Sequence, residues 1–97
     1  ALISRTLAHV ETLAAGLASR DVTARAYAAD VRDRDALRTA LQQAADELGP
    51  IEVLQYSPIP HRDFLKPLAD TTLDDLQAAV EFSVFGPATA VQQAAMS

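Results

Sequence analysis

The sequence predicts an α/β fold in which helices cover a parallel sheet on both faces, in three layers. Strand-like segments alternate with helical stripes in the order strand, helix, strand, helix, strand, loop, helix. Alternation of this kind favours right-handed βαβ units, whose strands run parallel. The composition, 49% hydrophobic and 22% charged, is ordinary for a folded domain, and no repeat or linker divides residues 1–97.

The first helix is predicted between two short strands. Residues Ala1–Ile3 are apolar and are expected to end a buried strand, and Val22–Ala28 alternates with the period of two that is typical of a strand. Ser4 or Thr6 can cap the helix between them. Its apolar stripe consists of Leu7, Val10, Leu13, Ala14 and Leu17.

The second helix has clear boundary signals. Asp33 is a favourable N-cap, Gly49 stands where a left-handed C-cap is expected, and Pro50 prevents continuation. The following residues, Ile51–Gln55, are predicted to form a third strand. The stripe of this helix consists of Leu37, Leu41, Ala44, Ala45 and Leu48.

The last helix follows a loop, residues 56–71, that holds three of the five prolines. Thr72 is expected to cap this helix, and the acidic residues of its first turn favour the helix dipole. Gly86-Pro87 is expected to kink or break it. Its stripe, predicted to be core, consists of Leu73, Leu76, Val80, Val84, Ala88, Val91 and Ala95.

Charge and composition exclude several classes of function. The net charge of −5 argues against a nucleic-acid binder with a basic face, and no apolar run approaches the ~20 residues that cross a bilayer. The absence of cysteine excludes disulfides and thiolate metal sites and fits a cytoplasmic protein. His61 and Asp63 are two potential metal ligands in a loop, with no third ligand nearby. We therefore predict that His61 is an exposed loop histidine and not part of a metal site.

Three polar segments follow the three predicted strands. They are Ser4–Thr6, Asp30–Val31 and Gln55–Pro58. In a doubly wound sheet, ligands bind at the carboxyl ends of the strands, so these segments are the candidate binding site. Tyr56 is compatible both with the core and with the wall of such a cleft, whereas His9 is expected to face solvent.

Three stretches together resemble the short-chain dehydrogenase/reductase family. They are the Asp30-Val31 pair, Gly49-Pro50-Ile51-Glu52-Val53-Leu54 and the helix start Thr72-Leu73-Asp74-Asp75. The resemblance implies a partial Rossmann-type NAD(P)-binding domain, from the end of the family's second strand to the helix after its fourth. The first strand with its glycine loop would precede Ala1, and the catalytic Tyr-x-x-x-Lys half would follow Ser97.

The resemblance also implies a function and site residues. NADP, or alternatively NAD, would be the cofactor of an oxidoreductase that acts on a small carbonyl or alcohol substrate. Arg5 would bind the ribose 2′-phosphate, because a guanidinium grips phosphate bidentately. Asp30 and Val31 would contact the adenine, Tyr56 and Ser57 would line the cofactor cleft, and Ser83 would stand at the position of the family's proton-relay asparagine.

The chain departs from the family's sequence at two sites, one beside the cofactor and one in the proton relay. Tyr56-Ser57-Pro58-Ile59 replaces Asn-Asn-Ala-Gly, and Ser83 replaces the relay asparagine. A catalytically degenerate nucleotide-binding or scaffolding protein is therefore the alternative, and an unrelated flavodoxin-like domain is a third hypothesis.

The resemblance further implies association of copies of the chain. A homo-oligomer, dimer or tetramer, would form through the helix at residues 73–96. Without a strand between Ile3 and Ile51–Gln55, these segments would face each other across a gap with apolar edges. We therefore expect that the 97 residues alone do not form a stable monomer.

Overall fold

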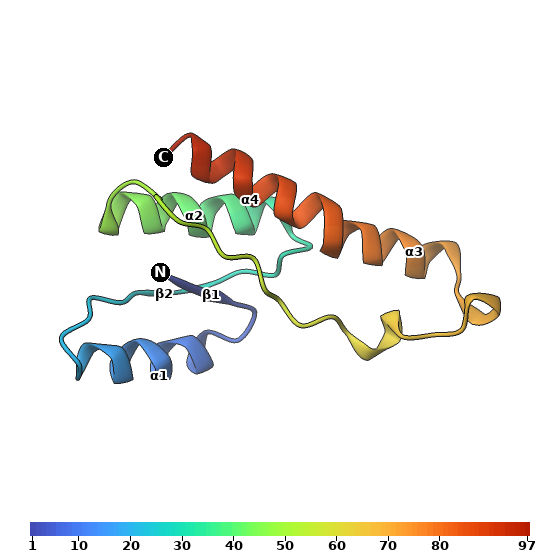
Figure 1. Cartoon of the computed structure of the whole chain (residues 1–97), viewed down its shortest axis with the longest axis horizontal. Coiled ribbons are helices and arrows are strands. Elements are labelled where there is room, and N and C mark those ends of the chain that lie inside the picture. The colour runs from blue at the N-terminus through green and yellow to red at the C-terminus, as the bar shows by residue number, and fades with distance from the viewer.

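The computed structural model describes residues 1–97 as three layers (Figure 1). The middle layer is a parallel sheet of two strands, β1 (Leu2–Ser4) and β2 (Ala26–Ala28). Helix α1 (Leu7–Ala18) covers one face, and α2 (Arg34–Leu48) and α4 (Gly86–Ala95) lie together on the other. The prediction of an α/β fold with a parallel sheet is confirmed.

The core lies between the sheet and α2. Its larger cluster joins Tyr27 and Ala29 of the β2 segment to Ala40 and Ala44 of α2. A second cluster joins Leu37 and Leu41 of α2 to Ala90 of α4. Leu37, Leu41 and Ala44 of the predicted stripe therefore face the core, as their helical spacing requires, whereas Leu48 at the end of the helix is exposed.

The ends of α2 follow their sequence signals. The Asp33 carboxylate accepts a hydrogen bond from the backbone N–H of Ala36 at 3.0 Å, which satisfies one free donor of the first turn. Gly49 ends the helix with a φ of +99°, which L-residues with side chains rarely adopt, but its ψ of 177° differs from the left-handed helical conformation that was expected. The backbone then leaves the helix at Pro50.

The expected third strand, Ile51–Gln55, is wrong as a strand. No ladder forms over these residues, because the sheet consists of β1 and β2 alone and supplies them with no paired strand. A hollow of about 330 Å³ separates Ala1 from residues 49–53, and the Val53 side chain is 86% exposed. The second strand is also shorter than the predicted Val22–Ala28, because its three-residue partner offers only three paired positions.

The last helix continues through Gly86-Pro87 instead of breaking there. Helix α3 (Leu73–Val80) passes into a π-helical turn, Glu81–Phe85, hereafter the π-turn, and then into α4. The extra residue of the π-turn lets the helix continue past Pro87, which lacks an N–H donor.

The expected burial of the last helix is reversed. The residues that face inward are mostly small, namely Gly86, Thr89, Ala90 and Gln93. The predicted core stripe lies on the outside, with Leu73 83% and Val91 59% exposed. Small side chains let α4 approach α2 closely, and the larger ones are left without a partner within the chain.

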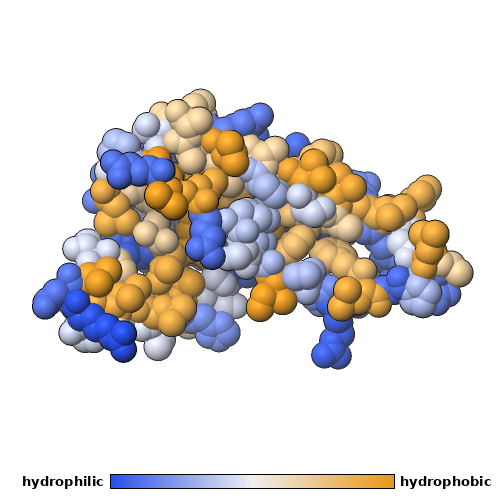
Figure 2. Space-filling model, viewed as in Figure 1, coloured by the Kyte–Doolittle hydropathy of each residue, from blue (hydrophilic) through white to orange (hydrophobic).

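The molecule exposes more surface than its mass predicts. Its accessible surface is 6901 Å², whereas a compact monomer of 10.3 kDa would expose about 5,400 Å². The radius of gyration is 15.1 Å, against about 12.5 Å for a compact domain of this length. Figure 2 shows apolar side chains on the surface over α1 and along the arm that contains α3. No helix is both long and apolar enough to cross a membrane.

We predict that the Tyr27 phenol makes the fold sensitive to alkali. The ring is 7% exposed and its hydroxyl donates to Glu47 at 2.9 Å. Burial, with the Glu47 carboxylate, raises the pKa of Tyr27 from 10.0 to about 12. Because the folded pKa is raised, its contribution to stability is present below pH 10 and is lost as pH rises toward 12, by about 2 kcal/mol.

Urea unfolding of the protein and of Tyr27→Phe, at pH values of about 8 and about 11.5, measures this loss. The phenylalanine variant should lose about 1 kcal/mol at the lower pH and show a smaller further loss in alkali. An equal alkaline loss in both proteins would contradict the assignment.

Candidate functional site: a cleft at the strand ends

One cleft brings together the three polar segments that the sequence singled out. Its volume is about 820 Å³, and it is lined by residues 3–6, 29–32 and 55–59. Its outer wall consists of His61, Asp63 and Phe64 from the loop and Asp75, Ala78 and Phe82 from the last helix. The carboxyl ends of β1 and β2 open into this cleft, because parallel strands end at the same edge of a sheet.

The first segment contributes a cation and several neutral donors. Arg5 is exposed on the cleft wall and takes part in none of the five ion pairs of the chain. Ser4 Oγ accepts from the Thr6 backbone N–H at 3.4 Å, and Thr6 occupies the N-cap of α1 without a side-chain cap. His9, expected to face solvent, is exposed but also lines the cleft, one helical turn beyond Arg5.

The second segment turns sharply after β2. One oxygen of Asp30 accepts from the backbone N–H of Arg32 at 2.9 Å, and its other oxygen makes no hydrogen bond within the chain. Arg32 Nε then donates to Glu81 at 3.0 Å, and this contact holds the pKa of Glu81 below its usual range. Asp30 and Val31 are thereby positioned at the cleft wall.

The third segment resolves the open question about Tyr56. Its ring is half-buried, packs against the cluster of Leu37, Leu41 and Ala90, and also lines the cleft. Desolvation, and then the negative charge of Asp30, raise the pKa of Tyr56. Ser57 lies beside it on the cleft wall, and its hydroxyl accepts from the Gln55 amide at 3.3 Å.

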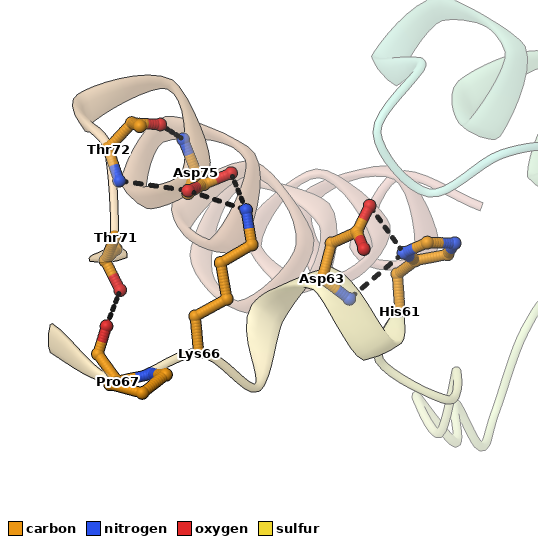
Figure 3. A network of polar contacts seen from close by, with 7 residues as sticks. All are labelled: His61, Asp63, Lys66, Pro67, Thr71, Thr72 and Asp75. Carbon is orange, nitrogen blue, oxygen red and sulfur yellow. Dashed lines mark hydrogen bonds and ion pairs between the residues drawn. The ribbon is translucent and has the colours of Figure 1, made fainter. Parts of the chain in front are cut away.

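The loop wall is tied to the start of α3 (Figure 3). The Lys66 ammonium donates to both oxygens of Asp75, at 3.1 and 3.0 Å. Thr72 caps α3, as the sequence predicts, and Asp75 completes a capping box with it. Phe64 and Phe82 meet edge to face with ring centroids 5.5 Å apart. These contacts hold residues 61–66 over the cleft.

His61 and Asp63 pair within one turn of this loop. The Asp63 backbone N–H donates to His61 Nδ1 at 3.2 Å, and the Asp63 carboxylate lies 3.3 Å from the same nitrogen. No group of three His, Cys, Asp or Glu side chains that could hold a metal ion occurs in the structure.

Ser83 lies apart from the cleft residues. Its hydroxyl donates to the carbonyl of Ala79 at 2.6 Å, one turn earlier in the helix, and its side chain is exposed. The structure thus brings together Arg5, Asp30, Val31, Tyr56 and Ser57, and leaves Ser83 on the helix surface outside the cleft wall.

A solved structure has a similar fold. It is the crystal structure of a blue fluorescent protein from a metagenomic library in complex with NADPH, with a TM-score of 0.77 and 32% sequence identity. The alignment covers 91% of this chain and 35% of that one. This chain is similar to part of an NADPH-bound protein. No protein-family profile matches the sequence, and no curated protein does either.

We predict that Asp75 controls the mobility of the loop wall. The Thr72 backbone N–H and then the Lys66 ammonium hold the pKa of Asp75 below its usual value. The contribution of this carboxylate is therefore present at neutral pH and disappears as pH falls through the lowered folded-state pKa. Asp75→Asn should accelerate backbone amide exchange of residues 62–71 several-fold at neutral pH, as measured by hydrogen–deuterium exchange.

Asp74→Asn is the matched control, because Asp74 lies next to Asp75 and makes no side-chain contact with the loop. Equal exchange rates in the two variants would show that the Asp75 contacts do not restrain the loop.

Proposed function

We propose that this protein, in its full natural length, is an NADP-dependent oxidoreductase of the short-chain dehydrogenase/reductase type. Its substrate would be a small carbonyl compound or alcohol. One observation carries the proposal: three polar segments, two of them at strand ends, converge on a single cleft, in a chain 32% identical to a protein crystallised with NADPH. Because the chain spans 35% of that protein, the catalytic acid would lie in residues beyond it.

The residues of the cleft suit the adenosine half of NADP. Arg5 has no carboxylate partner within the chain, so its guanidinium is available to a 2′-phosphate. Ser4 and Thr6 add hydroxyl donors beside it, and this segment contains no carboxylate to repel the phosphate. A preference for NADP over NAD follows, since an acidic residue here would instead favour the free ribose hydroxyl.

The second and third segments suit the adenine ring. The Asp30 oxygen that makes no bond within the chain can accept from the exocyclic amine, and Val31 offers an apolar contact. Tyr56 and Ser57 form the facing wall. The cofactor would supply hydride transfer, and this chain would bind and orient it. Ser83 stays a candidate for the relay position, and its bond to Ala79 must break for it to act there.

A catalytically degenerate nucleotide-binding protein is the second candidate. Pro58 lacks a backbone donor at the strand end, and the Ser83 hydroxyl is directed along its own helix. Oxidation of NADPH in the presence of a panel of small ketones separates the two functions. Turnover supports the oxidoreductase, whereas tight NADPH binding without turnover supports the degenerate protein.

Arg5→Glu tests the cofactor assignment. We expect the variant to bind NADPH at least about 10-fold more weakly, because a carboxylate would face the 2′-phosphate. NADH affinity should hold or rise, because a carboxylate can accept from the free ribose hydroxyls. Fluorescence titration of both nucleotides measures the two affinities. Arg20→Glu, at the far end of α1 and outside the cleft, is the charge-matched control. Equal losses for NADPH and NADH would contradict the assignment of Arg5.

We also propose that copies of this protein associate through the outer face of α3 and α4. The outward stripe described above includes Leu76, Val80, Val84 and Val91, all at least 40% exposed. The excess exposed surface of one chain, about 1,500 Å² over a compact monomer, exceeds the roughly 800 Å² that each partner buries in a standard protein interface. A dimer or tetramer would bury this face.

Val91→Lys should therefore shift the protein to a smaller species in sedimentation velocity, because a buried interface excludes an unpaired charge. Gln92→Lys, one residue along and also exposed, is the matched control. An unchanged oligomer in the Val91 variant would place the interface elsewhere, and a wild-type monomer would overturn the proposal.

A further inference from the structure

The π-turn is the point where two walls of the cleft meet the last helix. Arg32, from the second strand-end segment, binds Glu81 at its start. Tyr56, from the third segment, donates its hydroxyl to the carbonyl of Phe82. Gly86, at its end, lies against both Tyr56 and the backbone of Val31. Two segments far apart in sequence are therefore tied to one turn of helix.

The sequence explains why a side chain must complete this turn. The Gly86 N–H bonds to the carbonyl of Glu81, five residues earlier, in the π-helical pattern. Pro87 has no N–H to offer the next carbonyl, that of Phe82. The Phe82 carbonyl is therefore left without a helical donor, and the Tyr56 hydroxyl supplies the missing hydrogen bond. A phenylalanine at position 56 has no hydroxyl and could not donate this hydrogen bond.

The Tyr56 hydroxyl also leaves no room for a side chain at position 86, so this position requires glycine. A Cβ built on Gly86 would overlap the Tyr56 hydroxyl and lie 3.1 Å from the carbonyl of Val31. Gly86 is buried and has an ordinary helical φ of −59°. The need for glycine is therefore one of space and not of backbone conformation. Tyr56, Gly86 and Pro87 form one interdependent set.

We propose that Tyr56 is a positioning residue for the nucleotide cleft, which it shapes by holding the Phe82 carbonyl across Gly86. This role rests on the proposed function, since it concerns the same cleft. The bond fixes the third polar segment, Gln55–Pro58, against the helix, and Gly86 sets how closely the Val31 backbone approaches. Together they set the separation of the two walls that would enclose the adenine.

A double-mutant cycle tests this role. NADPH affinity is measured for the full-length protein, for Gly86→Ala, for Tyr56→Phe and for the double variant. Gly86→Ala should weaken binding about 10-fold, because the methyl group displaces both walls, and Tyr56→Phe about 3-fold. The double variant should bind better than Gly86→Ala alone, because loss of the hydroxyl makes room for the methyl group.

Recovery of NADPH affinity in the double variant distinguishes positioning from a general loss of stability. If Gly86→Ala merely weakened the whole fold, removal of the Tyr56 hydrogen bond would weaken it further. Gly16→Ala is the matched control: Gly16 lies on α1 with no atom within 4 Å of an added Cβ. This variant should gain thermal stability from helix propensity and leave NADPH affinity unchanged.

The outcomes separate the two proposals. A wild-type protein that does not bind NADPH overturns the proposed function, and this role with it. The role of Tyr56 is overturned, and the proposed function is not, if the wild-type protein binds NADPH and Gly86→Ala binds it equally well. Additive losses of affinity in the double variant overturn that role in the same way. If Gly86→Ala fails to fold, Tyr56→Phe and the double variant still decide: recovery of a folded, NADPH-binding double variant supports the role, and its absence contradicts it.

Discussion

The parallel pairing of β1 with β2 is the constraint on which the rest of the structure depends. Because the two strands run in the same direction, their carboxyl ends meet at one edge. Arg5 and Asp30, 25 positions apart in the sequence, therefore line one cleft. Antiparallel pairing would place them at opposite edges. The register of Ile3 opposite Tyr27 also directs the tyrosine into the core against α2.

Local signals in the sequence predict local structure well. Asp33, Gly49 and Thr72 act at the helix ends as expected, because a cap depends only on residues within one turn. The position of the cleft is equally predictable, since it follows from strand direction. Ile51–Gln55 shows the limit of such signals. Three of these five residues are large and apolar, but a strand exists only where a neighbour supplies hydrogen bonds.

The reversed face of the last helix has a related cause. Periodicity shows that Leu76, Val80 and Val84 share a face, but it does not show what covers that face. Within the chain, α4 approaches α2 through small residues instead. The contacts of Arg32 with Glu81 and of Tyr56 with Phe82 were also beyond prediction, because they join segments 49 and 26 residues apart. Only the Gly86-Pro87 pair marked that turn in the sequence.

The central claim is that the strand-end cleft binds NADP. Hydrogen–deuterium exchange of the full-length protein, with and without NADPH, tests it most directly. The account predicts that the nucleotide slows exchange in residues 4–6, 30–32 and 55–57, and leaves residues 11–18 of α1 unchanged. Protection confined to residues 49–53, at the opposite end of the sheet, or no protection at a saturating concentration, would contradict it.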